Sequence, residues 1–221
     1  MHNSVDKLIS IKKEILEITG EVNKTNNKAK VIAVSKTFPM KDILPLINHG
    51  HIHFGENKIQ EAIEKWEDIK NDFPHIKLHM IGKLQTNKVK YAIPLFDYIH
   101  SLDNLKLAQK ISNEQAKKKK KLKLFIQINI GEEAQKSGIH IEELEKFYEI
   151  CTTKLDLNII GLMCLPPENV NAAPYFLKIK NLNEKLNLKD LSIGMSNDYL
   201  EALKYNATFI RLGSKIFGKR S

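Results

Sequence analysis

The feature of this sequence that most constrains its fold is a regular alternation between short apolar runs and longer amphipathic segments. The apolar runs are rich in β-branched residues, as at 30–35 and 124–129, and such runs are typical of buried parallel strands. In the segments between them, apolar residues recur every three or four positions, which predicts helices. Strands that alternate with helices form a parallel sheet. We therefore expect strands at 30–35, 52–54, 78–81, 98–101, 124–129, 157–162, 191–194 and 208–212.

The number of strand–helix units predicts the architecture. Eight units in 221 residues fit a small (β/α)8 barrel of the TIM type with one extra N-terminal helix. An open, doubly wound α/β sheet is the alternative. Because no linker rich in Pro, Gly or Ser interrupts the chain, we expect one domain over 1–221, with the leading helix within 1–28 and the barrel at about 30–218. Helices are expected at 4–24, 41–49, 58–70, 87–93, 105–117, 141–152, 173–186 and 198–205, with a short one at 214–217.

The net charge of +9 comes almost entirely from lysine, because Arg211 and Arg220 are the only arginines among the 35 basic residues. Arginine reads guanine edges and binds phosphate in a bidentate manner, so its scarcity argues against sequence-specific nucleic-acid binding. The lysine run 117–121 could bind nucleic acid or an acidic membrane surface. This run follows a predicted helix, where positive charge complements the helix dipole, and we expect it to be solvated.

The sequence contains no obvious membrane or export signal. No stretch approaches the roughly 20 apolar residues of a membrane-spanning helix. Acidic residues interrupt the N-terminal segment, so we expect neither a signal peptide nor a transit peptide. Two cysteines make no disulfide framework: Cys151 is expected in the core, and Cys164 adjoins Met163. These features predict a cytoplasmic protein that does not bind membranes.

Candidate functional residues stand where the predicted strands end, because the C-terminal ends of barrel strands carry the chemistry in this fold. Lys36 ends the first strand, and an amine in a partly desolvated site loses its proton easily and can form a Schiff base. Ser196 follows the seventh strand, and Gly213 and Ser214 follow the eighth, where barrels often bind a phosphate beside a short helix. An amine opposite a phosphate site suits an aldehyde that carries a phosphate. Pyridoxal 5′-phosphate (PLP) is the commonest such cofactor.

Seven motifs occur along the chain in an order that supports this cofactor. They lie at 31–37, 54–57, 79–88, 136–139, 161–163, 191–196 and 211–218. Together they resemble the pyridoxal phosphate homeostasis protein family, whose single-domain barrel is similar to the N-terminal domain of alanine racemase. The resemblance covers nearly the whole chain from about residue 30 onwards.

The resemblance implies that PLP is held as a Schiff base on Lys36. The other cofactor-binding residues that it implies are Ser196, Gly213 and Ser214 at the phosphate, Arg211 at the pyridine nitrogen, and Asn57 and Met163 along the ring.

The resemblance also implies a function, because members of this family bind, buffer or deliver PLP and keep vitamin B6 and amino-acid pools balanced. We therefore expect a monomeric PLP carrier whose partners are PLP and PLP-dependent apoenzymes. A positive Arg211 beside the ring nitrogen disfavours protonation of that nitrogen, which makes the ring a weaker electron sink. We expect no robust catalytic activity on this basis. A PLP-dependent enzyme with weak amino-acid racemase or lyase activity is the alternative.

Two further patterns suggest other functions. Histidines at alternate positions could place metal ligands on one face, together with Glu56. They are His49, His51 and His53. Alternatively, His49 and His51 lie in an exposed loop before the second strand. The segment 213–219 spells most of a P-loop, but the Ser or Thr that this motif requires is replaced and no long helix follows, so we attribute the match to chance.

Overall fold

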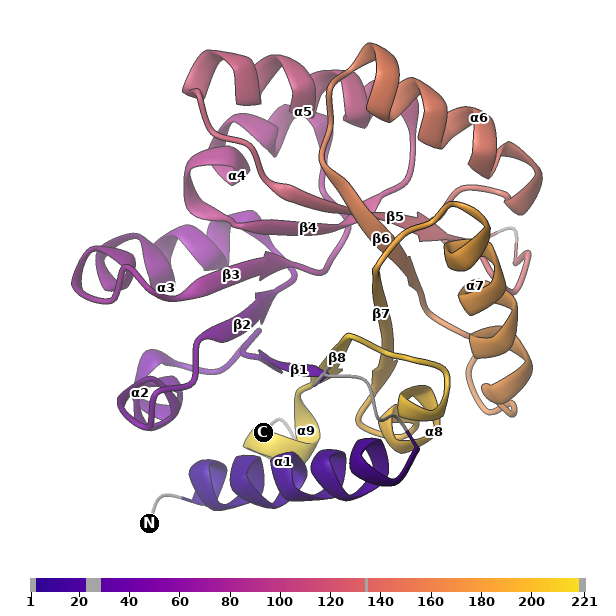
Figure 1. Ribbon diagram of the computed structural model, residues 1–221. Helices are drawn as coiled ribbons and strands as arrows, with labels where there is room; N and C mark the ends of the chain where they lie inside the picture. Colours follow the sequence, from indigo (N-terminus) through magenta and orange to yellow (C-terminus); the bar gives the residue numbers. More distant parts are fainter. Residues whose placement is uncertain (1–2, 23–28, 134, 219–221) are drawn as a thin grey trace.

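The computed structural model describes residues 3–22, 29–133 and 135–218. Its centre is a closed barrel of eight parallel strands, in the order β1 to β8, with helices around the outside (Figure 1). The strands are β1 (Lys30–Val34), β2 (His53–Glu56), β3 (Lys77–Met80), β4 (Tyr98–Leu102), β5 (Lys123–Ile128), β6 (Ile159–Cys164), β7 (Asp190–Met195) and β8 (Phe209–Leu212). The barrel confirms the predicted fold class, and the open sheet is wrong.

Parallel pairing between β1 and β8 closes the barrel. Lys30 lies opposite Phe209, and Ala33 lies opposite Leu212. Every connection between neighbouring strands must return the chain to the same end of the barrel, which is what the intervening helices do. All eight strands therefore end at one rim, and the segments that follow neighbouring strands are neighbours in space.

Helical segments precede the barrel and connect its strands, as the periodicity predicts. They are α1 (Asn3–Val22), α2 (Met40–Asn48), α3 (Ile59–Asp72), η1 (Thr86–Lys88), α4 (Val89–Leu95), α5 (Leu105–Lys118), η2 (Ile141–Glu143), α6 (Leu144–Glu149), η3 (Ile150–Lys154), α7 (Ala173–Lys185), α8 (Tyr199–Lys204) and α9 (Ser214–Phe217). Among the described residues, no helix is long and apolar enough to cross a membrane.

The leading helix α1 packs on the outside of the barrel through one apolar face. Val5, Leu8, Ile11 and Ile15 recur at helical spacing, and each is buried. The helix lies against α2, α8 and α9, beside the C-terminal part of the barrel (Figure 1). The expected helix at 4–24 is thus confirmed as far as residue 22, and positions 23–24 lie outside the described residues.

Two apolar clusters fill the molecule. The larger one lies between the strands and the surrounding helices. The smaller one consists of Ile32, Tyr98, Phe125, Met163 and Phe209. These five residues come from five different strands, so their side chains meet inside the barrel, which is a packed core as the TIM architecture requires.

The region from residue 141 to β6 differs from the prediction in two ways. The expected helix at 141–152 is divided into a 3-10 turn (η2), a short α-helix (α6) and a π-helical turn (η3). The Leu157 N–H donates to the carbonyl oxygen of Cys151 and thereby completes the end of this helical segment. β6 consequently begins at Ile159 instead of 157 and continues to Cys164, so Gly161 and Met163 lie within the strand and not at its end.

The lysine run 117–121 is partly engaged within the molecule. Lys117 forms an ion pair with Glu114, and Lys121 forms one with Asp156. Lys120 is half-buried, and its Nζ donates to the carbonyl oxygen of Pro94 at 2.8 Å. The expectation of a fully solvated run is therefore wrong for Lys120, because the chain turns back over α4 at this point.

Candidate functional site

The predicted site residues at the rim follow four neighbouring strands. Lys36 follows β1 and is half-buried, and Asn57 follows β2. Ser196 follows β7, Gly213 lies between β8 and α9, and Ser214 is the first residue of α9. β1 pairs with both β2 and β8, and β8 pairs with β7, so these residues occupy one continuous part of the rim.

Three contacts join the segments that follow β1, β7 and β8. A Cβ placed on Gly213 would lie 3.6 Å from the Cβ of Val34, so β1 and the β8–α9 turn are in contact. The Lys215 N–H, in the first turn of α9, points to Ser196 Oγ at 3.5 Å. The ring of Phe38 stacks on that of Phe217 at 4.8 Å. The hydroxyl of Ser196, after β7, and the backbone N–H of Lys215, after β8, therefore lie close together near the end of β1.

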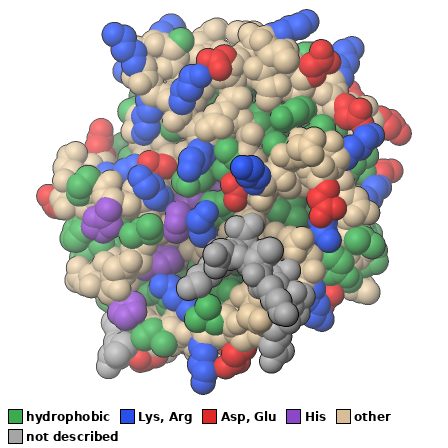
Figure 2. Space-filling model, in the orientation of Figure 1, with side chains coloured by type: hydrophobic (Ala, Val, Ile, Leu, Met, Phe, Trp, Pro, Cys, Tyr) green, Lys and Arg blue, Asp and Glu red, His purple; other side chains and the backbone are tan. Residues whose placement is uncertain are grey.

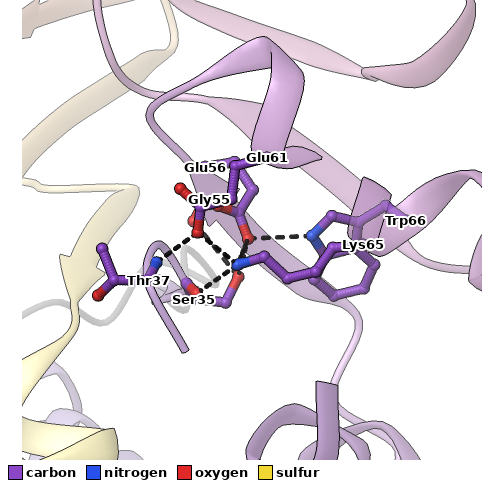
Figure 3. Close-up of polar contacts among 7 residues, drawn as sticks. All are labelled: Ser35, Thr37, Gly55, Glu56, Glu61, Lys65 and Trp66. Carbon is purple, nitrogen blue, oxygen red and sulfur yellow. Dashed lines mark hydrogen bonds and ion pairs between the residues drawn. The ribbon is translucent and has the colours of Figure 1, made fainter. Parts of the chain in front are cut away.

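The backbone on both sides of Lys36 is anchored by side chains from α3 (Figure 3). On one side, Lys65 Nζ donates to the carbonyl oxygen of Ser35 at 2.8 Å. On the other side, the Thr37 N–H donates to Glu61 Oε1. Thr37 has a φ of 68°, a left-handed conformation that is costly for a β-branched residue. These bonds hold the turn that presents Lys36.

A buried carboxylate, that of Glu56, is the centre of this anchor. Its Oε1 accepts hydrogen bonds from Ser35 Oγ at 2.8 Å, Lys65 Nζ at 3.0 Å and Trp66 Nε1 at 3.0 Å. Its Oε2 has no hydrogen-bond partner within the part of the chain that the structure describes. Lys65 also pairs with Glu61 at 2.7 Å. A buried charge is tolerated when it is paired, and Lys65 supplies the balancing cation.

The pKa of the Glu61 carboxyl is shifted by the same anchor. Burial acts to raise this pKa, but the hydrogen bonds from Lys65 and from the Thr37 N–H favour the charged form, and their combined effect is a lowered pKa. Glu61 is therefore ionised at neutral pH and accepts both bonds.

Arg211 lies within β8 and points into the barrel. Its Nη1 donates to the carbonyl oxygen of Ser192 at 2.7 Å and to Ser192 Oγ at 2.6 Å, and its Nη2 donates to the carbonyl oxygen of Cys164 at 3.0 Å. Burial lowers the pKa of Arg211 to about 10, which leaves the guanidinium positive at neutral pH. Burial also raises the pKa of the Cys164 thiol to about 12, so this cysteine is not an activated nucleophile.

Met163 and Asn57 lie in different surroundings. Met163 is 1% exposed and packs in the interior cluster with Ile32 of β1. Ile32 lies four positions before Lys36 in the sequence. Asn57 lies at the rim, where its backbone approaches Gly82 so closely that a Cβ there would be 2.4 Å from the Asn57 carbonyl oxygen. Met163 thus lies inside the barrel, and Asn57 lies at the rim.

The histidines near β2 do not form a metal site. Within the described residues, no group of three or more His, Cys, Asp or Glu side chains is arranged to hold a metal ion. His49 is exposed, but His51 is 4% exposed, so the expectation of an exposed loop is wrong for His51. The Nε2 of His51 lies 2.9 Å from the carbonyl oxygen of His53, which ties this ring to the backbone of β2.

Sequence reasoning missed two groups of polar residues behind the site. The first is the anchor of Lys36, in which Glu61, Lys65 and Trp66 join Glu56, which the sequence suggested only as a metal ligand. The second consists of His79, His100 and Ser192, which lie inside the barrel. A signal was present in both cases, because a charged or polar residue stands inside an otherwise apolar strand in β2, β3, β4 and β7.

Comparison with known proteins identifies the family. A profile of the alanine racemase N-terminal domain family matches residues 10–221. The pyridoxal phosphate homeostasis protein of Aquifex aeolicus is 34% identical over 227 residues, which cover 99% of this chain and 99% of that protein. The structure of PipY from Synechococcus elongatus PCC7942 with PLP bound has a TM-score of 0.85 at 29% identity and covers 97% of this chain and 100% of PipY. Alanine racemase from Corynebacterium glutamicum shares the fold, with a TM-score of 0.69 at 17% identity over 97% of this chain and 61% of the racemase. This chain therefore belongs to the pyridoxal phosphate homeostasis protein family, which is built on the barrel of the alanine racemase N-terminal domain.

Proposed function

We propose that this protein binds PLP covalently and acts as a PLP carrier or buffer that maintains vitamin B6 and amino-acid homeostasis. The observation that carries the proposal is the anchored Lys36 at the end of β1, beside the hydroxyl and N–H groups that follow β7 and β8. The PLP bound to PipY, which this chain matches along nearly its whole length, supports the same conclusion.

The donor set at the rim has the chemistry that PLP requires. The Lys36 amine would bond to the aldehyde carbon of PLP, with loss of one water and formation of a C=N bond. Ser196, Gly213 and Ser214 offer hydroxyl and backbone N–H groups to the phosphate. Asn57 would contact the ring at the rim, and Met163 would support it from inside the barrel.

Arg211 favours a carrier over a catalyst. PLP, when bound, supplies an electron sink for carbanions, and that sink is strongest when the ring nitrogen is protonated. A buried guanidinium that stays positive at neutral pH disfavours a second positive charge beside it. Arg211 would therefore donate a hydrogen bond to the ring nitrogen and keep it unprotonated.

Borohydride reduction followed by peptide mapping tests the covalent link. Borohydride reduces the C=N bond and fixes the pyridoxyl group, and we expect the label on the peptide that contains Lys36. Lys36→Ala should abolish the label, whereas Lys83→Ala, which removes an exposed lysine beyond β3, should not. A label on another lysine, or no label in protein supplied with PLP, would contradict the proposal.

Transfer to other proteins tests the carrier role. We propose that the recipients are PLP-dependent apoenzymes in the cytoplasm and that the protein acts as a monomer. Loaded protein should reactivate an apoenzyme in the presence of a scavenger that removes free PLP.

Amino-acid α-proton exchange should stay at the uncatalysed rate over a prolonged assay. Sustained exchange would instead assign a weak racemase or lyase activity.

A further inference from the structure

A network of polar side chains crosses the interior of the barrel from β2 to β8. We call it the histidine network, and it consists of His53, His79, His100, Ser192 and Arg211. The Nδ1 of His53 lies 2.9 Å from the Nε2 of His79, and the Nδ1 of His79 lies 2.9 Å from the Nε2 of His100. The Nδ1 of His100 lies 2.9 Å from Ser192 Oγ, which accepts from Arg211 Nη1 at 2.6 Å. Four hydrogen bonds thus connect His53, at the start of β2, to Arg211.

The network is enclosed by aromatic rings. The ring of His79 stacks on Tyr98 at 4.2 Å, and that of His100 stacks on Phe125 at 4.3 Å. His79, His100 and Ser192 are fully buried. Because aromatic faces offer no strong hydrogen-bond partner, the polar atoms of the network depend on one another.

One end of the network reaches the N-terminal mouth of the barrel. His53, the first residue of β2, is half-buried there, and Lys30, Lys77 and Lys123 begin β1, β3 and β5. Figure 2 shows His side chains gathered over α2, β2 and the start of β3, with Lys side chains beside them. Surface charge therefore surrounds one end of the network, and Arg211 forms the other end.

The chemistry of Arg211 gives the network a direction. A guanidinium has five N–H donors and no acceptor, so Arg211 can only donate to Ser192 Oγ. The Ser192 hydroxyl keeps its own proton when it accepts from Arg211, and it can donate this proton to Nδ1 of His100. A neutral imidazole that accepts at Nδ1 carries its proton on Nε2, so His100 donates to His79. By the same step, His79 donates from Nε2 to Nδ1 of His53.

We propose that the histidine network is a directional hydrogen-bond chain, started by Arg211, in which Ser192 and His100 are positioning residues for the guanidinium. The direction requires all three rings to be neutral and protonated on Nε2. Ser192 and Cys164 occupy three of the five donors of Arg211 within the described part of the chain. The two remaining donors would face the group held at the rim, and this last step rests on the proposed function.

The environment of the rings favours the neutral forms. Burial lowers the pKa of His79 and His100 far below 6.5, and the positive charge of Arg211 adds to this effect at His100. Burial, together with the positive charges of Lys30, Lys77 and Lys123, lowers the pKa of His53 to about 4, and Asp97 opposes this effect. An imidazolium has no acceptor nitrogen, so protonation of any ring would place two donors against each other and break the chain.

Nuclear magnetic resonance on the protein without PLP tests the direction. With ¹⁵N-labelled histidine, long-range ¹H–¹⁵N correlations distinguish Nε2–H, Nδ1–H and imidazolium rings. Near neutral pH, we expect His53, His79 and His100 to show only the Nε2–H form. An Nδ1–H form or an imidazolium at any of the three would overturn the proposal, whether or not the protein binds PLP.

Matched variants test the positioning role. Ser192→Ala removes the hydroxyl that joins Arg211 to His100, and Ser101→Ala removes a buried hydroxyl that has no hydrogen-bond partner within the described residues. In Ser101→Ala, we expect His100 still to show only the Nε2–H form. In Ser192→Ala, we expect His100 no longer to be restricted to that form. In PLP-loaded protein, Ser192→Ala should weaken PLP binding roughly tenfold and shift the pH profile of its absorption band.

A second pair of variants covers the case in which Ser192→Ala does not fold. His100→Gln keeps one acceptor and one donor in the same direction, whereas His100→Phe keeps a planar ring on Phe125 and removes both. We expect His100→Gln to preserve the Nε2–H form of His79 and His100→Phe to lose it. Equal spectra for His79 in the two variants would contradict the proposal. Failure of the proposed function would appear separately, as absence of a PLP absorption band in the wild-type protein.

Discussion

Both neighbours of Lys36 in the chain are held by hydrogen bonds to side chains. Ser35 and Thr37 are bonded to Lys65 and Glu61 on α3, and Glu56 is bonded to Ser35 and Lys65. These bonds restrict the backbone from which the amine projects. A reactive group that is held in place before its partner arrives loses less entropy on reaction.

Substitution of Glu61 should slow Schiff-base formation at Lys36 while it lowers the stability of the fold only slightly. Glu61→Ala removes the acceptor of the Thr37 N–H and one partner of Lys65. We expect Schiff-base formation to slow roughly tenfold, the equivalent of one charge-assisted hydrogen bond, with a loss of about 1 kcal/mol in the free energy of unfolding. Rapid-mixing absorption after addition of PLP measures the rate. Glu64→Ala, which removes an exposed carboxylate from the same helix, is the control, and equal rates in the two variants would refute the role of Glu61.

The buried pair of Glu56 and Lys65 should show strong coupling. Lys65→Met leaves the carboxylate of Glu56 buried without a cation, which costs about 3 kcal/mol in the free energy of unfolding. Glu56→Gln makes that position neutral, so the double variant should be more stable than the sum of the single effects by at least about 1 kcal/mol. Urea unfolding of the four proteins measures this difference. Additive effects would contradict direct pairing.

The residues of the site divide into those that sequence reasoning could find and those that it could not. Lys36, Ser196, Gly213 and Ser214 follow predicted strands, and the parallel arrangement alone brings strand ends to one rim. The pairing of Glu56 with Lys65 depends on how α3 rotates when it packs on β2. Local periodicity does not specify this rotation. The histidine network depends on the register between strands far apart in sequence, as for His100 and Ser192.

At the scale of elements, strands and helices were predictable wherever a local pattern determines them. The apolar runs locate all eight strands, because a strand buried on both faces must be apolar. The start of β6 was not predictable, because it depends on the bond between Leu157 and Cys151 that ends the preceding helical segment. Element boundaries of this kind depend on hydrogen bonds that form only when the neighbouring elements are in place.

The contribution of α1 to stability can be tested on two leucines of the same helix. Leu8 is fully buried, whereas Leu16 is 51% exposed. Leu8→Ala should lower the free energy of unfolding by about 2–5 kcal/mol, because it removes buried apolar surface and leaves a cavity. Leu16→Ala should change it by no more than about 0.5 kcal/mol. Chemical denaturation measures both values, and a similar effect at the two positions would show that α1 is not docked through its apolar face.

At the scale of the whole molecule, the buried histidines make stability depend on pH. Burial lowers the pKa of His51 to about 3 and that of His53 to about 4, and it lowers those of His79 and His100 well below 6.5. The unfolded chain therefore binds more protons than the folded protein at mildly acidic pH. Stability should fall as the pH drops below about 6.5, by up to about 1.4 kcal/mol per pH unit for each ring. The effect of His53 should level off near pH 4, where this ring is protonated in the folded protein as well.

Urea unfolding between about pH 7.5 and about pH 5 measures this dependence. His100→Gln should reduce the slope, because the amide does not titrate. His75→Gln, at an exposed position, should leave the slope unchanged. A stability that does not change over this interval would show that the buried rings titrate normally in the folded protein.

Closure of the barrel by β1 and β8 has a consequence for the order of events during synthesis. The strand that begins at Lys30 can pair with β2 early, but its second partner, the strand that begins at Phe209, must first leave the ribosome, so this contact is among the most distant in sequence. Lys36 and the Gly213–Ser214 turn belong to opposite sides of that seam. A nascent chain therefore lacks half of the proposed cofactor site until β8 and the Gly213–Ser214 turn have been synthesised, and PLP capture would report closure of the barrel.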